Sequence, residues 1–281
     1  MKWIDRSENS IPYYTFENIS KAGFSVNAFT SRIFRKNGET KDSLQLVMMN
    51  DSDPAEVEYC ERAMMDQFGI DPSRLVFAAQ EHTVNIHVVV PEDLAPENIR
   101  PKLEGIDGLV TDIPHVMLKT FGADCPSVFL ADPVHKAIGL CHSGRNGTQR
   151  HISAKMLKVM QEKFGTQPAQ VLAAVSPGIC VECYEVGDDV AEDFIMDYLD
   201  LSGASAMTGL ERGLSEGLLQ FIDGRYHIDL PLSIRLSLTA AGVPEENIEE
   251  SHMCTKCRKD IFFSLRGEGR ILNENCALFM V

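Results

Sequence analysis

The chain has 281 residues and a formal net charge of −15, with 44% hydrophobic and 24% charged residues. This is the composition of a globular protein with enough apolar side chains to build a core. The strong negative charge repels phosphate backbones, which disfavours nucleic acid as a partner. A small anionic substrate would therefore need a local cluster of basic side chains.

The first ten residues, MKWIDRSENS, lack the apolar stretch of a signal peptide, and no apolar run is long enough to cross a membrane. We therefore expect a cytoplasmic protein with no membrane partner. In that compartment the eight cysteines are better interpreted as thiols or metal ligands than as disulfides.

The predicted elements begin with a helix that starts at Asp53 and Pro54 and stops at Gly69. Short apolar runs between polar turns then predict strands at Leu75–Ala79, Val84–Val90, Leu109–Thr111, Val128–Leu130 and Ala137–Leu140. Apolar residues at helical spacing predict a helix from Thr148 to Phe164. Beyond it we expect strands at Leu172–Val175, Asp260–Leu265 and Ala277–Val281, and helices at Asp188–Asp200 and Leu230–Ala241.

Strands outnumber helices in this order and do not alternate with them regularly. The pattern predicts an α+β fold with a mixed β-sheet core flanked by helices. No repeat, low-complexity tract or long linker divides the sequence, so we expect one domain over residues 1–281.

The stretch from Gly122 to His151 concentrates the candidate chemistry. Cys125 precedes one predicted strand, and His142 follows the next predicted strand seventeen positions later. Two neighbouring antiparallel strands would bring these residues side by side. Together with His82, which lies in a polar interruption between strands, they predict a three-ligand zinc site with an open fourth position. The alternative is an ordinary strand–loop–helix connection in which Cys and His are incidental.

Two glycines, Gly144 and Gly147, follow His142 and precede the predicted helix. A glycine turn that leads into a helix presents free backbone N–H groups. Such a turn is a suitable seat for an anion.

Two further cysteine pairs are Cys180-Val-Glu-Cys183 and Cys254-Thr-Lys-Cys257. The second pair begins 71 positions after Cys183, much farther than the spacing of a zinc ribbon. Three interpretations stay open: a four-cysteine zinc site assembled by the fold, reduced thiols near the active site, and redox chemistry.

Motifs spread over nearly the whole chain point to a family. They are Ser31-Arg32, Gly38, Gln80-Glu81-His82, Asp107–Thr111, Ala123-Asp124-Cys125, His142-Ser143-Gly144, Gly147-Thr148, Pro177-x-Ile179, Cys183–Gly187, Cys254-Thr255-x-Cys257 and Phe263-Ser264-x-Arg266. In order and spacing they resemble the YfiH family, also labelled polyphenol-oxidoreductase laccase-domain proteins, whose members are described as purine nucleoside phosphorylases.

The resemblance implies that His82, Cys125 and His142 bind a catalytic zinc ion. It also implies phosphorolysis of adenosine, inosine, guanosine or methylthioadenosine, in which phosphate attacks the sugar C1′, together with adenosine deamination. The expected partners are thus a nucleoside and phosphate, and the expected assembly is a monomer or homodimer.

Phosphate binding on so acidic a chain requires arginines, and Arg32, Arg145 and Arg266 lie in motif positions. The chain departs from the family pattern at Arg145-Asn146, where the family has Trp-Arg.

Three other functions are weighed against this one. In a cysteine hydrolase or transferase, Cys125 would be the nucleophile and His142 its base, with no metal between them. Copper-dependent phenol oxidation needs several copper ions held largely by histidines, and eight scattered histidines with no His-x-His pair do not support it. A zinc-stabilised interaction module would use only the two C-x-x-C pairs.

Overall fold

The computed structural model describes residues 1–5, 10–36, 39–41, 44–48, 52–95, 103–200, 206–270 and 273–281. Gly38, one of the motif residues, lies outside these ranges. No helix among the described residues is long and apolar enough to cross a membrane.

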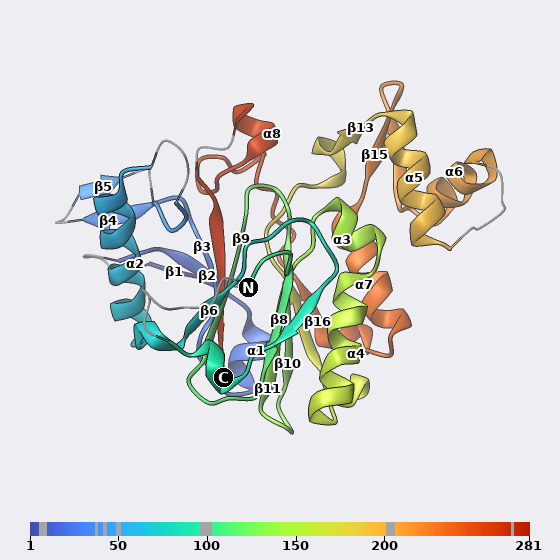
Figure 1. Cartoon of the computed structure of the whole chain (residues 1–281). Coiled ribbons are helices and arrows are strands. Elements are labelled where there is room, and N and C mark those ends of the chain that lie inside the picture. The colour runs from blue at the N-terminus through green and yellow to red at the C-terminus, as the bar shows by residue number, and fades with distance from the viewer. Residues whose placement is uncertain are drawn as a thin grey trace.

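Two six-stranded sheets form the centre of the molecule (Figure 1). The first has the order β1 (Lys2–Ile4), β2 (Tyr13–Thr15), β3 (Asn27–Thr30), β17 (Asn275–Met280), β9 (Met117–Gly122) and β6 (Leu75–Phe77). The second has the order β16 (Ile248–Glu250), β12 (Leu172–Val175), β10 (Ser127–Asp132), β11 (Ala137–His142), β8 (Gly108–Thr111) and β7 (Ile86–Val88). Parallel pairs join β6 to β9, β12 to β16 and β7 to β8, while the other pairs are antiparallel. Both sheets are therefore mixed, which confirms the predicted α+β class, with two sheets where one was expected.

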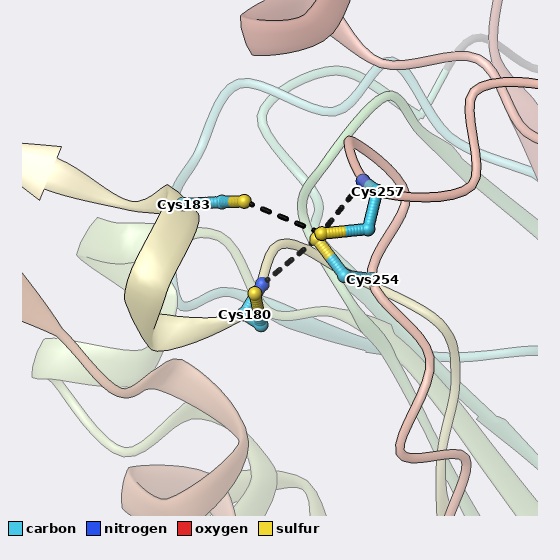
Figure 2. Close-up of side chains that lie close together, drawn as sticks. All are labelled: Cys180, Cys183, Cys254 and Cys257. Atoms are coloured by element: carbon cyan, nitrogen blue, oxygen red, sulfur yellow. Dashed lines mark hydrogen bonds between the residues drawn. The ribbon is translucent and has the colours of Figure 1, made fainter.

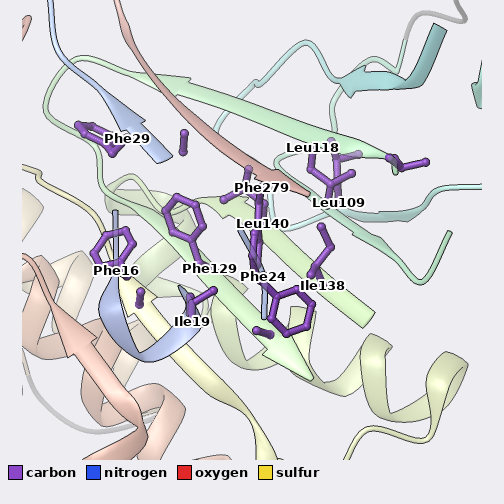
Figure 3. Packing of buried hydrophobic residues seen from close by; sticks show 14 of the residues in the cluster. Phe16, Ile19, Phe24, Phe29, Leu109, Leu118, Phe129, Ile138, Leu140 and Phe279 are labelled. Carbon is purple, nitrogen blue, oxygen red and sulfur yellow. The ribbon is translucent and has the colours of Figure 1, made fainter. Parts of the chain in front are cut away.

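The main apolar core lies between the two sheets (Figure 3). Side chains from the first sheet interdigitate there with side chains from the second, among them Phe29, Leu118 and Phe279 against Leu109, Phe129 and Leu140. The inner strands β10 and β11 are buried along their whole length, because each is covered on both faces. Such strands carry continuous apolar runs, which is why the sequence predicted them.

Helices cover the two outer faces. α2 (Pro54–Phe68) packs on the first sheet, and α4 (Ile152–Phe164) and α7 (Leu230–Ala240) pack on the second (Figure 1). α2 begins as predicted: the side chain of Asp53 accepts a hydrogen bond from the Ala55 backbone N–H, and Gly69 ends the helix in a left-handed conformation. The predicted helix over 230–241 is likewise confirmed, capped by Asp229.

A smaller group of elements packs beyond α7. It comprises β13 (Glu185–Val186), α5 (Asp188–Tyr198), α6 (Ala206–Ser215), β14 (Leu219–Ile222) and β15 (Arg225–Ile228), with a separate apolar cluster around Phe194 and Ile195. The remaining α-helices and strands of the described residues are α1 (Glu17–Lys21), β4 (Phe34–Lys36), β5 (Glu39–Lys41), α3 (Arg145–Gln149) and α8 (Leu265–Glu268).

Two predicted elements are wrong in detail. The helix expected over Thr148–Phe164 is split into α3 and α4, because His151 adopts a left-handed backbone with φ of +57°. The strand expected over Asp260–Leu265 is a series of turns that leads into α8. Its apolar run is explained by Phe262, which packs into the core between the sheets instead of pairing in a sheet.

Candidate metal centre and active site

His82, Cys125 and His142 come together where the chain passes between the two sheets. Their ligand atoms all lie within 4.8 Å of one another. The segment between β6 and β7 crosses from the first sheet to the second and carries His82. The segment between β9 and β10 crosses in the same sense and carries Cys125. His142 ends β11 and is paired with Ser127 of β10, so the predicted proximity of Cys125 and His142 follows from the antiparallel register.

Asp107 holds His82 and His142 in position through hydrogen bonds. Its carboxylate accepts hydrogen bonds from the backbone N–H groups of Glu81, His82 and Thr83, at 2.7 to 3.1 Å. The same carboxylate lies 2.8 Å from Nδ1 of His142, which leaves Nε2 as the ring nitrogen for a metal. A carboxylate that holds the far nitrogen of a ligating histidine is a recurrent feature of metal sites. Asp107 stands in a motif but received no role from the sequence, because an aspartate before a strand looks like a turn residue.

Each of Cys125, His142 and Asp107 is favoured in its charged form by its neighbours in the group. Burial raises the pKa of the Cys125 thiol, but the neighbouring His142 and His82 outweigh this effect and lower it to about 6. Burial lowers the pKa of His142, whereas Cys125 and Asp107 together raise it to about 10. Burial also raises the pKa of Asp107, and the hydrogen bonds from His142 and Thr83 bring it to about 2. Without a metal, the group therefore holds a thiolate beside an imidazolium at neutral pH.

Gly144 lies so close to the three candidate ligands that a side chain at this position would crowd them. A Cβ added at this position would lie 2.8 Å from Sγ of Cys125 and 3.1 Å from Cδ2 of His82. Gly144 is also the residue before α3, the short helix that starts at Arg145. The predicted glycine turn thus leads into a helix of one turn, and its glycine faces the candidate ligands.

The residue before Cys125 is held in an unusual conformation. Asp124 has φ of +100°, which is rare for any residue with a side chain. Its carboxylate accepts hydrogen bonds from Thr255 Oγ1 and Ser264 Oγ, both at 2.6 Å, and from the Arg266 backbone N–H at 2.7 Å. These contacts fix the backbone conformation directly before Cys125. Residues kept in strained conformations cluster at functional sites.

The three arginines take different places. Arg266 lies over the ring of Tyr184, with 5.1 Å from its guanidinium carbon to the ring centroid, and donates a hydrogen bond to the Glu185 carbonyl. Burial raises the pKa of Tyr184, as does the charge of Cys125, while Arg145 and Arg266 lower it, so Cys125 and both arginines lie near Tyr184.

Arg32 is buried. It forms an ion pair with Glu268 at 2.6 Å and donates to the carbonyls of Lys259 and Phe262. These contacts hold the segment that carries Arg266.

One more side chain beside the group escaped the sequence analysis. Glu274, directly before β17, is half-buried, and burial raises the pKa of its carboxyl while His142 and His82 lower it. Nothing in the sequence marks this residue, because it lies 132 positions after His142. It adds an acid to the candidate site.

A thiolate and two imidazoles lie together at the junction of the two mixed sheets. The protein therefore has a candidate mononuclear metal centre. The chain belongs to the family described as multi-copper polyphenol oxidoreductase laccase, whose model matches residues 26–276.

Its similarity to characterised proteins extends over most of the chain. It is 31% identical over 216 residues to a purine nucleoside phosphorylase of Bacteroides thetaiotaomicron, covering 75% of this chain and 76% of that protein. It is 32% identical over 205 residues to adenosine deaminase RL5 of an unknown prokaryotic organism, covering 72% and 73%.

Two solved structures share the fold. They are the hypothetical protein YfiH of Bacillus licheniformis, with a TM-score of 0.77, 29% identity and coverage of 91% and 92%, and YlmD of Geobacillus stearothermophilus, with a TM-score of 0.77, 27% identity and coverage of 91% and 91%. The predicted resemblance to the YfiH family is confirmed.

Proposed function

We propose that this protein is a zinc-dependent purine nucleoside phosphorylase that holds zinc through His82, Cys125 and His142. The observation that carries the proposal is the close approach of these three ligand atoms, with Asp107 hydrogen-bonded to His142 and two arginines near Tyr184. Its relatives named as purine nucleoside phosphorylases support a purine nucleoside and phosphate as substrates.

The donor set fits zinc. One thiolate and two neutral imidazoles leave the fourth tetrahedral position for a reactant, as in catalytic zinc sites. The lowered pKa of Cys125 supplies the thiolate near neutral pH, and Gly144 leaves room beside it. When bound, zinc would act as a Lewis acid on an oxygen of the substrate or of water.

Copper-dependent phenol oxidation is less well supported by the donor residues. The part of the chain that the structure describes holds two groups able to bind a metal, and only one of them contains histidine. A multi-copper centre needs a larger set of histidine ligands.

Phosphate would be bound by Arg145 and Arg266. Charge-assisted hydrogen bonds from guanidinium groups are the usual means of holding phosphate, and this chain needs them because its net charge is −15. Tyr184 holds the guanidinium of Arg266 against its ring. Arg32 would act indirectly, since its ion pair with Glu268 holds α8 in place.

In the reaction, a phosphate oxygen forms a bond to C1′ as the bond from C1′ to the purine nitrogen breaks. The bonding electrons leave with the purine, which must gain a proton. Glu274 is the carboxyl group beside the two histidines that can hold a proton for this step. The arginines keep the attacking phosphate in position, which lowers the entropic cost of the reaction.

Two other activities have an observation in their favour. The relative named adenosine deaminase favours hydrolytic removal of the purine amino group as a second activity of the same site. The Cys125 thiolate beside His142 favours a cysteine nucleophile if no metal binds.

The test uses protein of known zinc content. Incubated with adenosine and phosphate, it should release adenine and ribose 1-phosphate, and omission of phosphate should stop that release. Turnover that persists after complete removal of zinc would favour the cysteine nucleophile instead. Inosine formed without phosphate would show the deaminase activity.

A further inference from the structure

Four cysteines form a second cluster that the proposed reaction does not use. They are Cys180, Cys183, Cys254 and Cys257, and their Sγ atoms all lie within 4.8 Å of one another (Figure 2). Sγ of Cys183 lies 3.5 Å from Sγ of Cys257. None of the four belongs to the group of His82, Cys125 and His142.

The backbone brings the two C-x-x-C pairs together. Gly178 and Cys254 form a parallel bridge, in which the Gly178 N–H donates to the Met253 carbonyl and the Thr255 N–H donates to the Gly178 carbonyl. Each pair then folds as a tight turn: the Cys183 N–H donates to the Cys180 carbonyl, and the Arg258 N–H donates to the Cys254 carbonyl. A turn of this kind directs both of its thiols to the same side.

The surroundings of Cys254 suit a thiolate. Sγ of Cys254 accepts hydrogen bonds from the backbone N–H groups of Cys180 and Cys257, both at 3.4 Å. Hydrogen bonds to the charged form stabilise a thiolate.

The spacing of the sulfur atoms suits one metal ion. With a zinc–sulfur distance of about 2.3 Å, the sulfurs of a tetrahedral site lie about 3.8 Å apart. The cluster needs only small adjustments to reach that geometry. Cys257 is exposed, and a cavity of about 720 Å³ borders the cluster, so a metal ion can enter from solvent.

We propose that Cys180, Cys183, Cys254 and Cys257 bind a second, structural zinc ion. Four thiolate ligands close the coordination sphere, so this zinc has no open position and takes no part in the chemistry. Its role would be to join the segment around Gly178 to the segment around Thr255, which are far apart in the sequence.

Both joined segments support the candidate active site. The Ile179 N–H donates to the Asp124 carbonyl at 2.8 Å, and Thr255 Oγ1 donates to the Asp124 carboxylate. Asp124 directly precedes Cys125. The second zinc would therefore hold the two segments that keep Asp124 in its strained conformation.

The first experiment measures the zinc bound per chain in purified protein after exhaustive dialysis. We expect about two zinc ions in the wild type and about one in Cys257→Ser, which removes an exposed thiol and disturbs little packing. Cys125→Ser should also hold about one zinc ion, and the combination of both substitutions should hold none. Cys60→Ala is the control, because Cys60 is a buried thiol outside both groups, and it should keep both ions.

A second experiment does not depend on how a cysteine variant of the cluster folds. Cobalt(II) added to metal-depleted Cys125→Ser should produce the intense visible bands and sulfur-to-metal charge-transfer bands of tetrahedral cobalt thiolate. Because the cluster is intact in this variant, the spectrum reports on it alone. Zinc should then displace the cobalt and abolish the bands.

Several results would overturn the proposal. One is a wild type that holds a single zinc ion, which is lost in Cys125→Ser. Others are a Cys183–Cys257 disulfide in protein purified without reductant, iron in place of zinc, and cobalt-treated Cys125→Ser without thiolate bands. None of these results bears on phosphorolysis, which is measured separately.

Discussion

Nδ1 of His142 lies 2.8 Å from Oδ1 of Asp107, and both side chains are almost completely buried. The contact fixes the imidazole ring so that its other nitrogen faces Cys125. Because the pKa of Asp107 is about 2, the carboxylate is charged at neutral pH and holds the adjacent ring strongly.

Substitution Asp107→Asn should therefore weaken zinc binding. The neutral amide loses the charge that orients His142 and part of the support for His82. Loss of such a partner typically weakens metal binding about 10- to 100-fold. Competition with a chromophoric chelator measures the dissociation constant.

The matched control is Asp132→Asn. Asp132 is also a buried aspartate, 2.8 Å from Nδ1 of His135, but it lies at the other end of β10. Its substitution should leave zinc affinity unchanged. Equal effects of the two substitutions would mean that Asp107 acts on folding and not on the metal ligands.

Substitution Gly144→Ala should abolish zinc binding at the first site. The added Cβ would lie 2.8 Å from Sγ of Cys125, so the thiol or the turn must move. Gly224→Ala is the control for a loss of stability remote from the metal site: a Cβ there has no atom within 4 Å, but the left-handed φ of +81° makes alanine strained. Both variants should lose some stability in a thermal melt, but only Gly144→Ala should lose metal. A Gly144→Ala protein with full zinc occupancy would place the metal elsewhere.

The thiol of Cys125 should titrate far below an ordinary cysteine in the metal-free protein. Its pKa is lowered to about 6, so the thiolate is present above that pH and is lost as the pH falls through it. The thiolate absorbance of the wild type minus that of Cys125→Ser measures this titration. In His142→Ala the midpoint should shift upward, because the imidazolium that stabilises the thiolate is gone. A wild-type midpoint near the ordinary value of about 8.5 would contradict the pairing.

Substitution Arg266→Ala should raise the apparent KM for phosphate while zinc content stays unchanged. One charge-assisted hydrogen bond contributes about 1.5–3 kcal/mol, which corresponds to about a 10- to 150-fold change. Arg62→Ala is the control, because Arg62 is an exposed arginine on α2 that pairs with Glu58. An unchanged KM in Arg266→Ala would remove this residue from the phosphate site.

Part of the candidate site could be predicted because its residues stand at the ends of consecutive strands. Cys125 and His142 flank β10 and β11, and a two-stranded antiparallel connection brings such positions together. The sequence could not show that β6 and β7 belong to different sheets. Strand length and polarity are the same whether the next strand joins the same sheet or the facing one, so the crossing at His82 emerged only from the structure.

The errors have physical causes as well. An apolar run such as Ile261-Phe262-Phe263 predicts a strand by composition, but here Phe262 fills the core between the sheets from a turn. Asp107 was missed because its partners lie 24 to 35 positions away, and hydrogen bonds over such distances leave no local pattern.

The central claim is phosphorolysis at the first metal centre, and one measurement tests it most directly. Zinc-loaded wild-type protein and Cys125→Ser are incubated with adenosine and phosphate, and adenine and ribose 1-phosphate are quantified together by chromatography. We expect the two products in equal amounts from the wild type and none from Cys125→Ser. If the zinc-loaded wild type releases no adenine at high enzyme concentration, or if Cys125→Ser is equally active, the proposed function is wrong.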